Sequence, residues 1–272
     1  MKIAVTGPRG RLASWLIAHY GCTPLNCDIT DFERTRLEIH RVNPDVVIHA
    51  AAYTDVDKAE EEPELALAVN LRGTGNVRTA FHGYMVYLST AYIFDGRASQ
   101  PYSENETPSP IQHYGWTKWV GEAAMLAGSG PRLIIRTMTL YGPGPQPDFV
   151  KGIVNRLCKE SHLYLPMDLY GNPTYVPHLA IGIWKAIKDR LTGVLNLTGK
   201  DVVSRYEFAE AIARTFNFDR ALLHSGEYPV VPNKVLRPRM AGLDLTHAKR
   251  NKIPVFSMKA GLREMKKQWE RE

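Results

Sequence analysis

The sequence predicts an α/β fold, a doubly wound parallel sheet of the Rossmann type with a smaller α/β substrate domain. Short apolar runs alternate with helical patterns through the first half of the chain, which is typical of a parallel sheet with helices on both faces. The first run, residues 2–6, leads directly into a glycine-rich turn. With 272 residues, 44% hydrophobic and 23% charged, the chain is long enough for one large domain or two interleaved ones.

Five segments carry the strand pattern. Buried strands are expected at 2–6, 45–49, 84–88, 132–136 and 193–197. Helices are expected from the glycine turn to about Tyr20 and near 31–42, 63–81, 113–127, 148–160, 178–189, 204–216 and 258–270. A loop rich in glycine and proline, Tyr141-Gly-Pro-Gly-Pro-Gln-Pro147, separates the regular first part of the chain from a less regular second part.

The charge of the chain favours a phosphate-bearing ligand over nucleic acid. The formal net charge is +6 but the charges are scattered, and no nucleic-acid motif or basic stripe is found. No apolar run is long enough to span a membrane, and the first residues enter a strand, so no signal peptide is expected. Cys22, Cys27 and Cys158 have no metal-type spacing and are expected to be reduced thiols. We therefore expect a cytoplasmic enzyme with no metal, no nucleic-acid partner and no membrane association.

The turn Gly7-Pro-Arg-Gly10-Arg-Leu-Ala13 predicts a dinucleotide site. In this pattern Gly7 permits the tight turn, Gly10 lets a pyrophosphate approach the backbone at the helix N-terminus, and Ala13 allows close helix–sheet packing. A generic strand–turn–helix corner is the alternative.

Two arginines in this turn favour NADPH as the cofactor. The segment 20–28 is short and offers no convincing acidic residue for a ribose hydroxyl. Arg9 and Arg11 carry guanidinium groups that suit a 2′-phosphate. Both could equally be solvated surface charges, and NADH stays open.

Tyr114 and Lys118 are the candidate catalytic pair, because residues four apart share one face of a helix. An ammonium beside a phenol favours the phenolate, so the tyrosine pKa is expected to fall towards neutrality, where the residue can exchange a proton with a substrate oxygen. Thr90 ends an apolar run and is the third candidate. Its neighbour Ser89 is expected to be structural, with a contact to the cofactor as the alternative. Taken alone, Tyr114 could be an ordinary helix tyrosine.

Together these residues resemble the extended short-chain dehydrogenase/reductases, and longer strings resemble the dTDP-4-dehydrorhamnose reductases among them. The strings are Asp28-Ile-Thr-Asp31, His49-Ala-Ala-Ala-Tyr-Thr-Asp-Val-Asp-Lys-Ala-Glu60 with Asn70 beyond it, Leu88-Ser-Thr-Ala-Tyr-Ile-Phe-Asp-Gly96, Gly171-Asn-Pro-Thr174 and Arg237-Pro-Arg-Met-Ala-Gly-Leu-Asp244. The resemblance covers essentially the whole chain.

The resemblance implies NAD(P)H-dependent reduction of the 4-keto group of a nucleotide-linked 6-deoxy sugar. Tyr114 would then donate the proton, Lys118 would lower its pKa and hold the nicotinamide ribose, and Thr90 would hydrogen-bond the carbonyl or the tyrosine. Residues 1–142 plus 176–198 would form the dinucleotide-binding domain, and 143–175 plus 199–272 the nucleotide-sugar domain.

The resemblance also assigns the remaining site residues. Cofactor binding would involve Gly7, Arg9, Gly10, Arg11, Leu12, Asp28, Ile29, Ala50, Ala51, Ala52, Tyr114 and Lys118. Substrate binding would involve Thr54, Val56, Thr90, Ala91, Tyr92, Thr139 and Arg237. Arg237 and Arg239 would lie at the nucleotide diphosphate, and each could instead be a solvated surface charge. Ala91 stands where the family often has aspartate, and Thr139 stands where some members have tryptophan. These two differences leave the identity of the sugar undecided.

Two rival functions remain. One is a non-catalytic regulatory or binding subunit of the same fold, similar to the methionine adenosyltransferase β subunit. The other is a sibling epimerase or dehydratase, although dehydratases usually have acidic residues after the threonine. The chain is expected to be a monomer or a homodimer.

Other prominent side chains have plainer expectations. His49, at the end of a buried strand, is expected to be a hydrogen-bonded core histidine. Trp116 and Trp119 flank Lys118 and are expected to pack against other residues.

Overall fold

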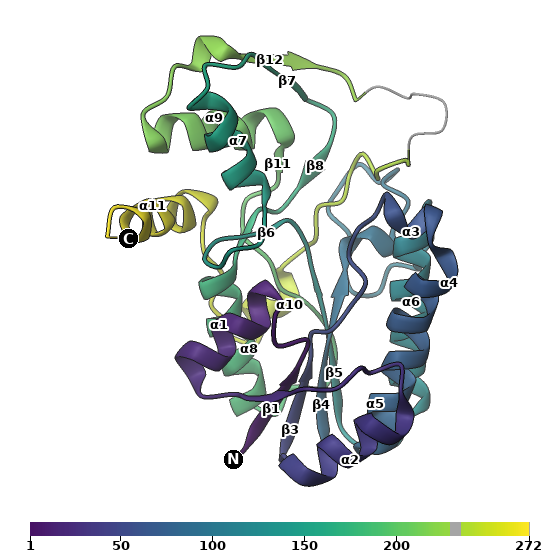
Figure 1. The fold of residues 1–272 in the computed structure, drawn as a ribbon. Coiled ribbons are helices and arrows are strands. Elements are labelled where there is room, and N and C mark those ends of the chain that lie inside the picture. The colour runs from purple at the N-terminus through teal and green to yellow at the C-terminus, as the bar shows by residue number, and fades with distance from the viewer. Residues whose placement is uncertain (229–234, 272) are drawn as a thin grey trace.

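The computed structural model describes residues 1–228 and 235–271 (Figure 1). Its centre is a six-stranded parallel sheet with the order β10-β5-β4-β3-β1-β2. The strands are β1 (Ile3–Thr6), β2 (Thr23–Leu25), β3 (Val46–His49), β4 (Tyr84–Thr90), β5 (Arg132–Thr137) and β10 (Gly193–Asn196). All five expected strands are confirmed, and β2 is an addition.

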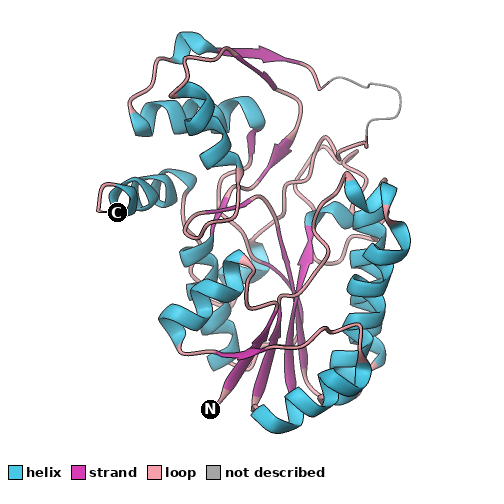
Figure 2. Ribbon diagram, in the orientation of Figure 1, coloured by secondary structure: helices cyan, strands magenta, loops and turns pink. Residues whose placement is uncertain are grey.

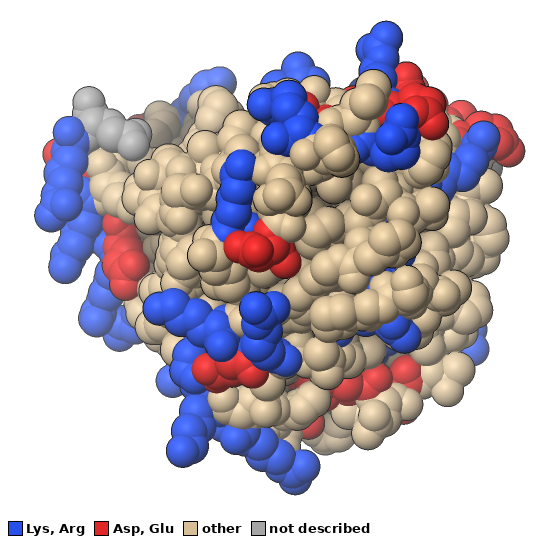
Figure 3. All heavy atoms as spheres, turned by 90° about the horizontal axis from the view of Figure 1, so that it is seen from below, with Lys and Arg blue, Asp and Glu red and all other residues tan. Residues whose placement is uncertain are grey.

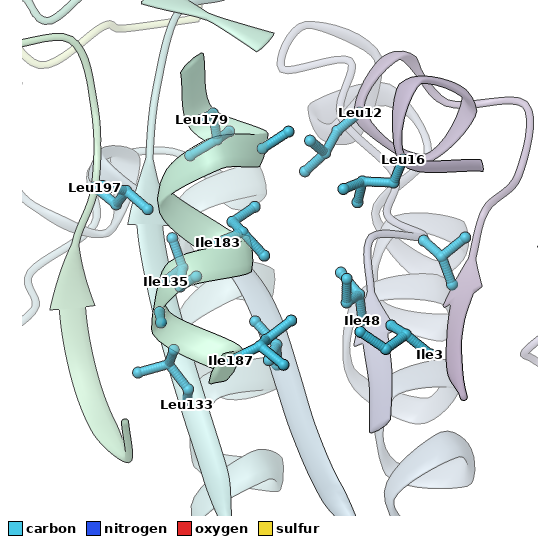
Figure 4. Packing of buried hydrophobic residues seen from close by; sticks show 14 of the residues in the cluster. Ile3, Leu12, Leu16, Ile48, Leu133, Ile135, Leu179, Ile183, Ile187 and Leu197 are labelled. Atoms are coloured by element: carbon cyan, nitrogen blue, oxygen red, sulfur yellow. The ribbon is translucent and has the colours of Figure 1, made fainter. Parts of the chain in front are cut away.

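Helices cover both faces of this sheet (Figure 2). One face carries α1 (Arg11–Tyr20) and α8 (Val176–Lys188). In Figure 4, Leu12 and Leu16 of α1 approach the same apolar layer as Ile183 and Ile187 of α8. The other face packs against α2 (Phe32–Val42), α5 (Thr74–Ala80) and α6 (His113–Ala127). The doubly wound prediction is confirmed.

The expected helix 63–81 is confirmed as an unbroken helical run over 63–80, but its middle is a π-helix rather than an α-helix. The structure has α3 (Lys58–Glu61), α4 (Pro63–Leu67), a π-helix η1 (Ala68–Gly73) and then α5. The amide of Asn70, inside the π-helix, accepts from the Tyr53 N–H at 2.8 Å and donates to the Thr117 hydroxyl at 3.0 Å. The π-helix therefore occurs where the Asn70 side chain connects the segment after β3 to helix α6 through these two hydrogen bonds.

A second hydrophobic cluster lies beyond the ends of the strands, in the upper part of Figure 1. It packs α7 (Phe149–Leu157), α9 (Arg205–Phe216) and α11 (Met258–Trp269) with the parallel pair β7 (Leu163–Pro166) and β12 (Leu223–Gly226). Two short pairs join it to the sheet region: β6 (Leu140–Tyr141) with β9 (Thr174–Tyr175), and β8 (Tyr170–Gly171) with β11 (Val203–Ser204). The helices near 148–160, 178–189, 204–216 and 258–270 are confirmed with small shifts at their ends.

Short helices complete the chain: η2 (Ala91–Ile93), η3 (Arg220–Leu222) and α10 (Thr246–Arg250). Ala248 of α10 and the nearby Ile253 belong to the first hydrophobic cluster, the apolar layer that α1 and α8 form with the sheet. The C-terminal segment thus contributes to this cluster and to the second one. Residues 229–234 and 272 of that segment lie outside the described residues.

The surface in Figure 3 carries Lys and Arg interspersed with acidic side chains and broad uncharged areas. On this face the basic residues do not merge into one stripe. None of the described helices combines the length and the apolar character that crossing a membrane requires.

Candidate active site

The turn after β1 brings the chain close to the end of β3. Gly7 has φ +65°, and a Cβ added there would lie 2.8 Å from the Ala51 Cα. Only glycine combines this conformation with this approach. Gly10 is the N-cap residue of α1, and no N-cap side chain accepts from the first N–H groups of the helix. An anion site at a helix N-terminus uses such N–H groups.

Two adjoining cavities follow the carboxyl ends of the strands, at the place where the strand order reverses between β1 and β3. The first has a volume of about 860 Å³ and is lined among others by Gly7, Arg9, Gly10, Asp28, Ile29, Ala50, Ala51 and Ala52. Gly10, Ala50 and Ala52 also line the second cavity. The two cavities therefore form one trough.

The second cavity, of about 500 Å³, collects the candidate catalytic residues. Its lining includes Arg11, Leu12, Thr54, Val56, Ser89, Thr90, Tyr92, Tyr114, Lys118 and Thr139. These residues come from α1, the loop after β3, the end of β4, helix α6 and the loop after β5. The fold thus brings together residues that are far apart in the sequence.

Tyr114 is held beside Thr90 by a close approach of α6 to the end of β4. A Cβ on Gly115 would lie 2.0 Å from the Tyr92 carbonyl oxygen, so only glycine fits. The Gln112 side chain accepts from the Gly115 N–H at 2.7 Å and caps the helix. Burial raises the pKa of Tyr114 to about 12, although its hydrogen bond with Thr90 lowers it.

Lys118 is buried one turn further along α6, with Nζ 4.1 Å from the centre of the Tyr87 ring. Burial lowers its pKa to about 7, and the nearby Glu122 carboxylate opposes that shift. Glu122 itself forms a buried ion pair with Arg136 at 2.9 Å and accepts a hydrogen bond from Ser89. Ser89 thus has a structural partner, and it also lines the catalytic cavity.

Comparisons with known proteins agree with this geometry. Residues 1–271 match the family model described as the RmlD substrate binding domain. A dTDP-4-dehydrorhamnose reductase of Mycolicibacterium smegmatis is 34% identical over 223 residues, covering 77% of this chain and 68% of that protein.

The chain belongs to the RmlD substrate binding domain family.

Solved members of this family share the whole architecture. The dTDP-4-dehydrorhamnose reductase of Bacillus anthracis, in complex with NADP, superposes with a TM-score of 0.92 at 28% identity, covering 98% of this chain and 100% of that one. A dTDP-4-dehydrorhamnose reductase of Clostridium acetobutylicum superposes with a TM-score of 0.92 at 30% identity, covering 99% of this chain and 100% of that one. The resemblance found in the sequence is confirmed.

The expected effect of Lys118 on Tyr114 is wrong in this RmlD-family structure. Burial raises the pKa of the tyrosine and lowers that of the lysine to about 7, so the ammonium is only partly charged near neutral pH. Desolvation disfavours the charged form of each group, which is the phenolate for Tyr114 and the ammonium for Lys118. The tyrosine is therefore protonated at neutral pH.

Arg11 does not point a free guanidinium at a 2′-phosphate. It donates to the carbonyls of Gly142 at 2.7 Å, Pro143 at 3.1 Å and Pro147 at 3.0 Å, and it pairs with Asp148 at 3.0 Å. Both partners of that ion pair are nearly buried. Arg11 thus fixes the loop after β6 against the glycine turn, whereas Arg9 is exposed at the first cavity.

One further expectation needs correction. Ala91 is completely buried within an apolar cluster beside Ile93 and Phe94 and lines none of these cavities. Trp116 and Trp119 also line none of these cavities. They are 38% and 37% exposed, so more than half of each residue is covered.

His49 is the hydrogen-bonded core histidine that the sequence led us to expect, and Arg237 lies near the catalytic cavity. His49 is buried, with Nδ1 2.8 Å from the Thr6 hydroxyl and Nε2 3.0 Å from the Thr74 hydroxyl. Arg237 lines a small slot beside the catalytic cavity and donates to Asp57 at 2.8 Å.

Several lining residues were not found from the sequence. Gln146 and Pro147 line the catalytic cavity, Arg34 lines the first cavity, and Arg205 lines both the catalytic cavity and the slot. The only sequence signal near Arg205 is the pattern Ser204-Arg-Tyr-Glu207, which is typical of a helix start and does not indicate a binding site. Among the residues that the structure describes, no group of three or more His, Cys, Asp or Glu side chains could hold a metal ion.

Proposed function

We propose that this chain catalyses NADPH-dependent reduction of the 4-keto group of a nucleotide-linked 6-deoxy sugar, the reaction that the name dTDP-4-dehydrorhamnose reductase gives to its relatives. One observation carries the proposal. A single trough runs from the glycine turn at Gly7 to the cavity that holds Thr90, Tyr114 and Lys118. A reductase needs this juxtaposition of a dinucleotide cradle and a proton donor.

The residues present fit a dinucleotide. The uncapped N-terminus of α1 offers backbone N–H groups to a pyrophosphate, and Ala50, Ala51 and Ala52 leave room beneath it. Asp28 and Ile29 line the adenine end, where exposed Arg9 would contact a 2′-phosphate. When bound, the cofactor supplies the hydride.

The side chains of the catalytic cavity supply the proton. Tyr114 is protonated at neutral pH, because burial raises its pKa to about 12, and it can therefore donate to the ketone oxygen as charge develops there. Thr90 hydrogen-bonds Tyr114 and orients the phenol. Lys118 faces the same cavity and would hold the nicotinamide ribose.

The substrate side is formed by Thr54, Val56, Tyr92 and Thr139, with Arg237 in the adjoining slot. Thr139 has φ +47°, a conformation that β-branched residues rarely adopt. It would present the sugar with a short polar side chain, where some family members have tryptophan.

The remaining expectations complete the proposal. Residues 1–142 plus 176–198 would bind the dinucleotide and 143–175 plus 199–272 the nucleotide sugar. Most residues of two hydrophobic clusters follow this division, while Ala248 and Ile253 pack with the sheet and Tyr141 packs in the second cluster. The enzyme would be cytoplasmic and act as a monomer or a homodimer.

The test is NADPH and NADH oxidation, followed by the nicotinamide absorbance, with dTDP-4-keto-6-deoxyglucose and a 3,5-epimerase present. Faster oxidation of NADPH than of NADH is expected. Cofactor binding without turnover on this or other keto-sugar nucleotides would contradict the proposal and favour a regulatory subunit.

A further inference from the structure

The small slot beside the catalytic cavity is lined by two arginines, Arg205 and Arg237, and not by Tyr114. Tyr92, Met138, Thr139 and Arg205 line both the slot and the catalytic cavity. The two spaces therefore meet at these four residues, and Arg205 stands at the junction.

The two arginines differ in the partners that they already have. Arg237 donates to the Asp57 carboxylate at 2.8 Å and to the Val235 carbonyl at 2.9 Å. Within residues 1–228 and 235–271, the Arg205 guanidinium has no hydrogen bond or ion pair; it lies over the Phe149 ring, 4.9 Å from its centre. Its donors are thus available to an oxyanion, while those of Arg237 are partly used.

Arg205 is held on a rigid base. It is the first residue of α9, where Ser204 and Glu207 form a reciprocal capping box. The Phe149 ring beneath it stacks on Phe208, at 5.1 Å between ring centres. The guanidinium is therefore preorganised, and the N-terminus of α9 adds positive potential at the same place.

We infer that Arg205 binds the β-phosphate of the nucleotide sugar, the phosphate attached to the sugar, and so makes the enzyme require a diphosphate-linked substrate. This inference rests on the proposed function, because it places the sugar beside Thr90 and Tyr114. A phosphate directly attached to that sugar reaches the junction first. Arg237, which lines the slot but not the catalytic cavity, faces the nucleoside end.

Calorimetric titration of dTDP and dTMP into the NADPH-loaded chain tests the inference. In Arg205→Gln the Kd for dTDP is expected to rise about 10- to 100-fold, the range for a lost charge-assisted hydrogen bond. The Kd for dTMP, which lacks the β-phosphate, should change less than about threefold, because that contact does not exist for it. Arg205→Lys keeps the charge but loses the paired donors of the guanidinium, so its Kd for dTDP should lie between those of wild type and Arg205→Gln.

Arg214→Gln is the matched control, because it removes the same charge from an exposed position on the same helix. It should leave both Kd values unchanged. An unchanged dTDP Kd in Arg205→Gln would overturn the inference. So would an equal loss for dTMP and dTDP, or an equal loss of NADPH binding and thermal stability, which would indicate a merely structural role.

The two proposals can fail separately. If the wild-type chain binds dTDP but reduces no keto sugar, the reductase proposal fails while the ratio of Kd values still decides the role of Arg205. If the wild-type chain binds none of dTDP, UDP and GDP, the Arg205 inference is overturned whatever the turnover.

Discussion

Acid should destabilise this protein through His49, a buried histidine next to the cofactor trough. Thr74 donates its hydroxyl proton to the Asn70 carbonyl, so it accepts from His49 Nε2–H. The Thr6 hydroxyl accepts from the Ala50 N–H and donates to Nδ1. The neutral ring is fully hydrogen-bonded, and burial, together with the charge of Lys118, lowers its pKa to about 3.

The size of the effect follows from linkage. Below pH 6.5 the unfolded chain takes up a proton on His49 that the folded chain refuses, so the free energy of unfolding falls as the pH drops from 6.5 towards 3. At 1.36 kcal/mol per pH unit, lowering the pH to about 4.5 removes roughly 3 kcal/mol, and the whole window removes roughly 5 kcal/mol.

Urea unfolding at several pH values, compared between wild type and His49→Gln, isolates this contribution because all carboxylates are common to both. The wild type should lose about 3 kcal/mol more than the variant between pH 6.5 and about 4.5. His40→Gln, an exposed histidine on α2, is the control and should keep the wild-type slope. Equal slopes in wild type and His49→Gln would refute the reasoning.

Three further variants test the buried charges and the cofactor end. Arg11→Ala leaves the Asp148 carboxylate buried without its cation and should lower the free energy of unfolding, measured in urea, by about 3 kcal/mol. An unchanged urea midpoint would contradict the role of Arg11 in fixing the loop after β6. Glu122→Gln removes the charge that pairs with buried Arg136 and should remove about 3 kcal/mol, whereas a loss under about 1 kcal/mol would mean that the pair is dispensable. Arg9→Ala should reduce the preference for NADPH over NADH about tenfold in kcat/KM, and an unchanged ratio would exclude Arg9 from the 2′-phosphate site.

Strong local patterns in the sequence were enough to place most of the fold. The apolar runs of β1, β3, β4 and β5 are mostly buried, and β10 is buried in its second half. Each run is recognisable without its neighbours. Thr23-Pro24-Leu25 forms β2 but is too short to show a period. The π-helix around Asn70 was missed because its pattern differs little from that of an ordinary helix.

The site was predictable where a residue type is tied to backbone geometry. Gly7 is such a case, because its φ and its approach to Ala51 allow only glycine. Arg11 was misread because its partners lie in a loop far along the chain. The pKa of Tyr114 was misjudged because local spacing reveals the neighbouring lysine but not the burial of both groups.

The central claim is that the Tyr114 hydroxyl supplies the proton in a hydride-transfer reduction. The most direct measurement compares kcat/KM for the keto-sugar nucleotide and the Kd for NADPH in wild type and Tyr114→Phe, with Tyr20→Phe, a tyrosine on α1, as the control. We predict that Tyr114→Phe loses about 10²- to 10⁴-fold in kcat/KM and keeps its NADPH Kd, while the control matches wild type. A Tyr114→Phe variant that retains kcat/KM within about threefold of wild type would contradict the account.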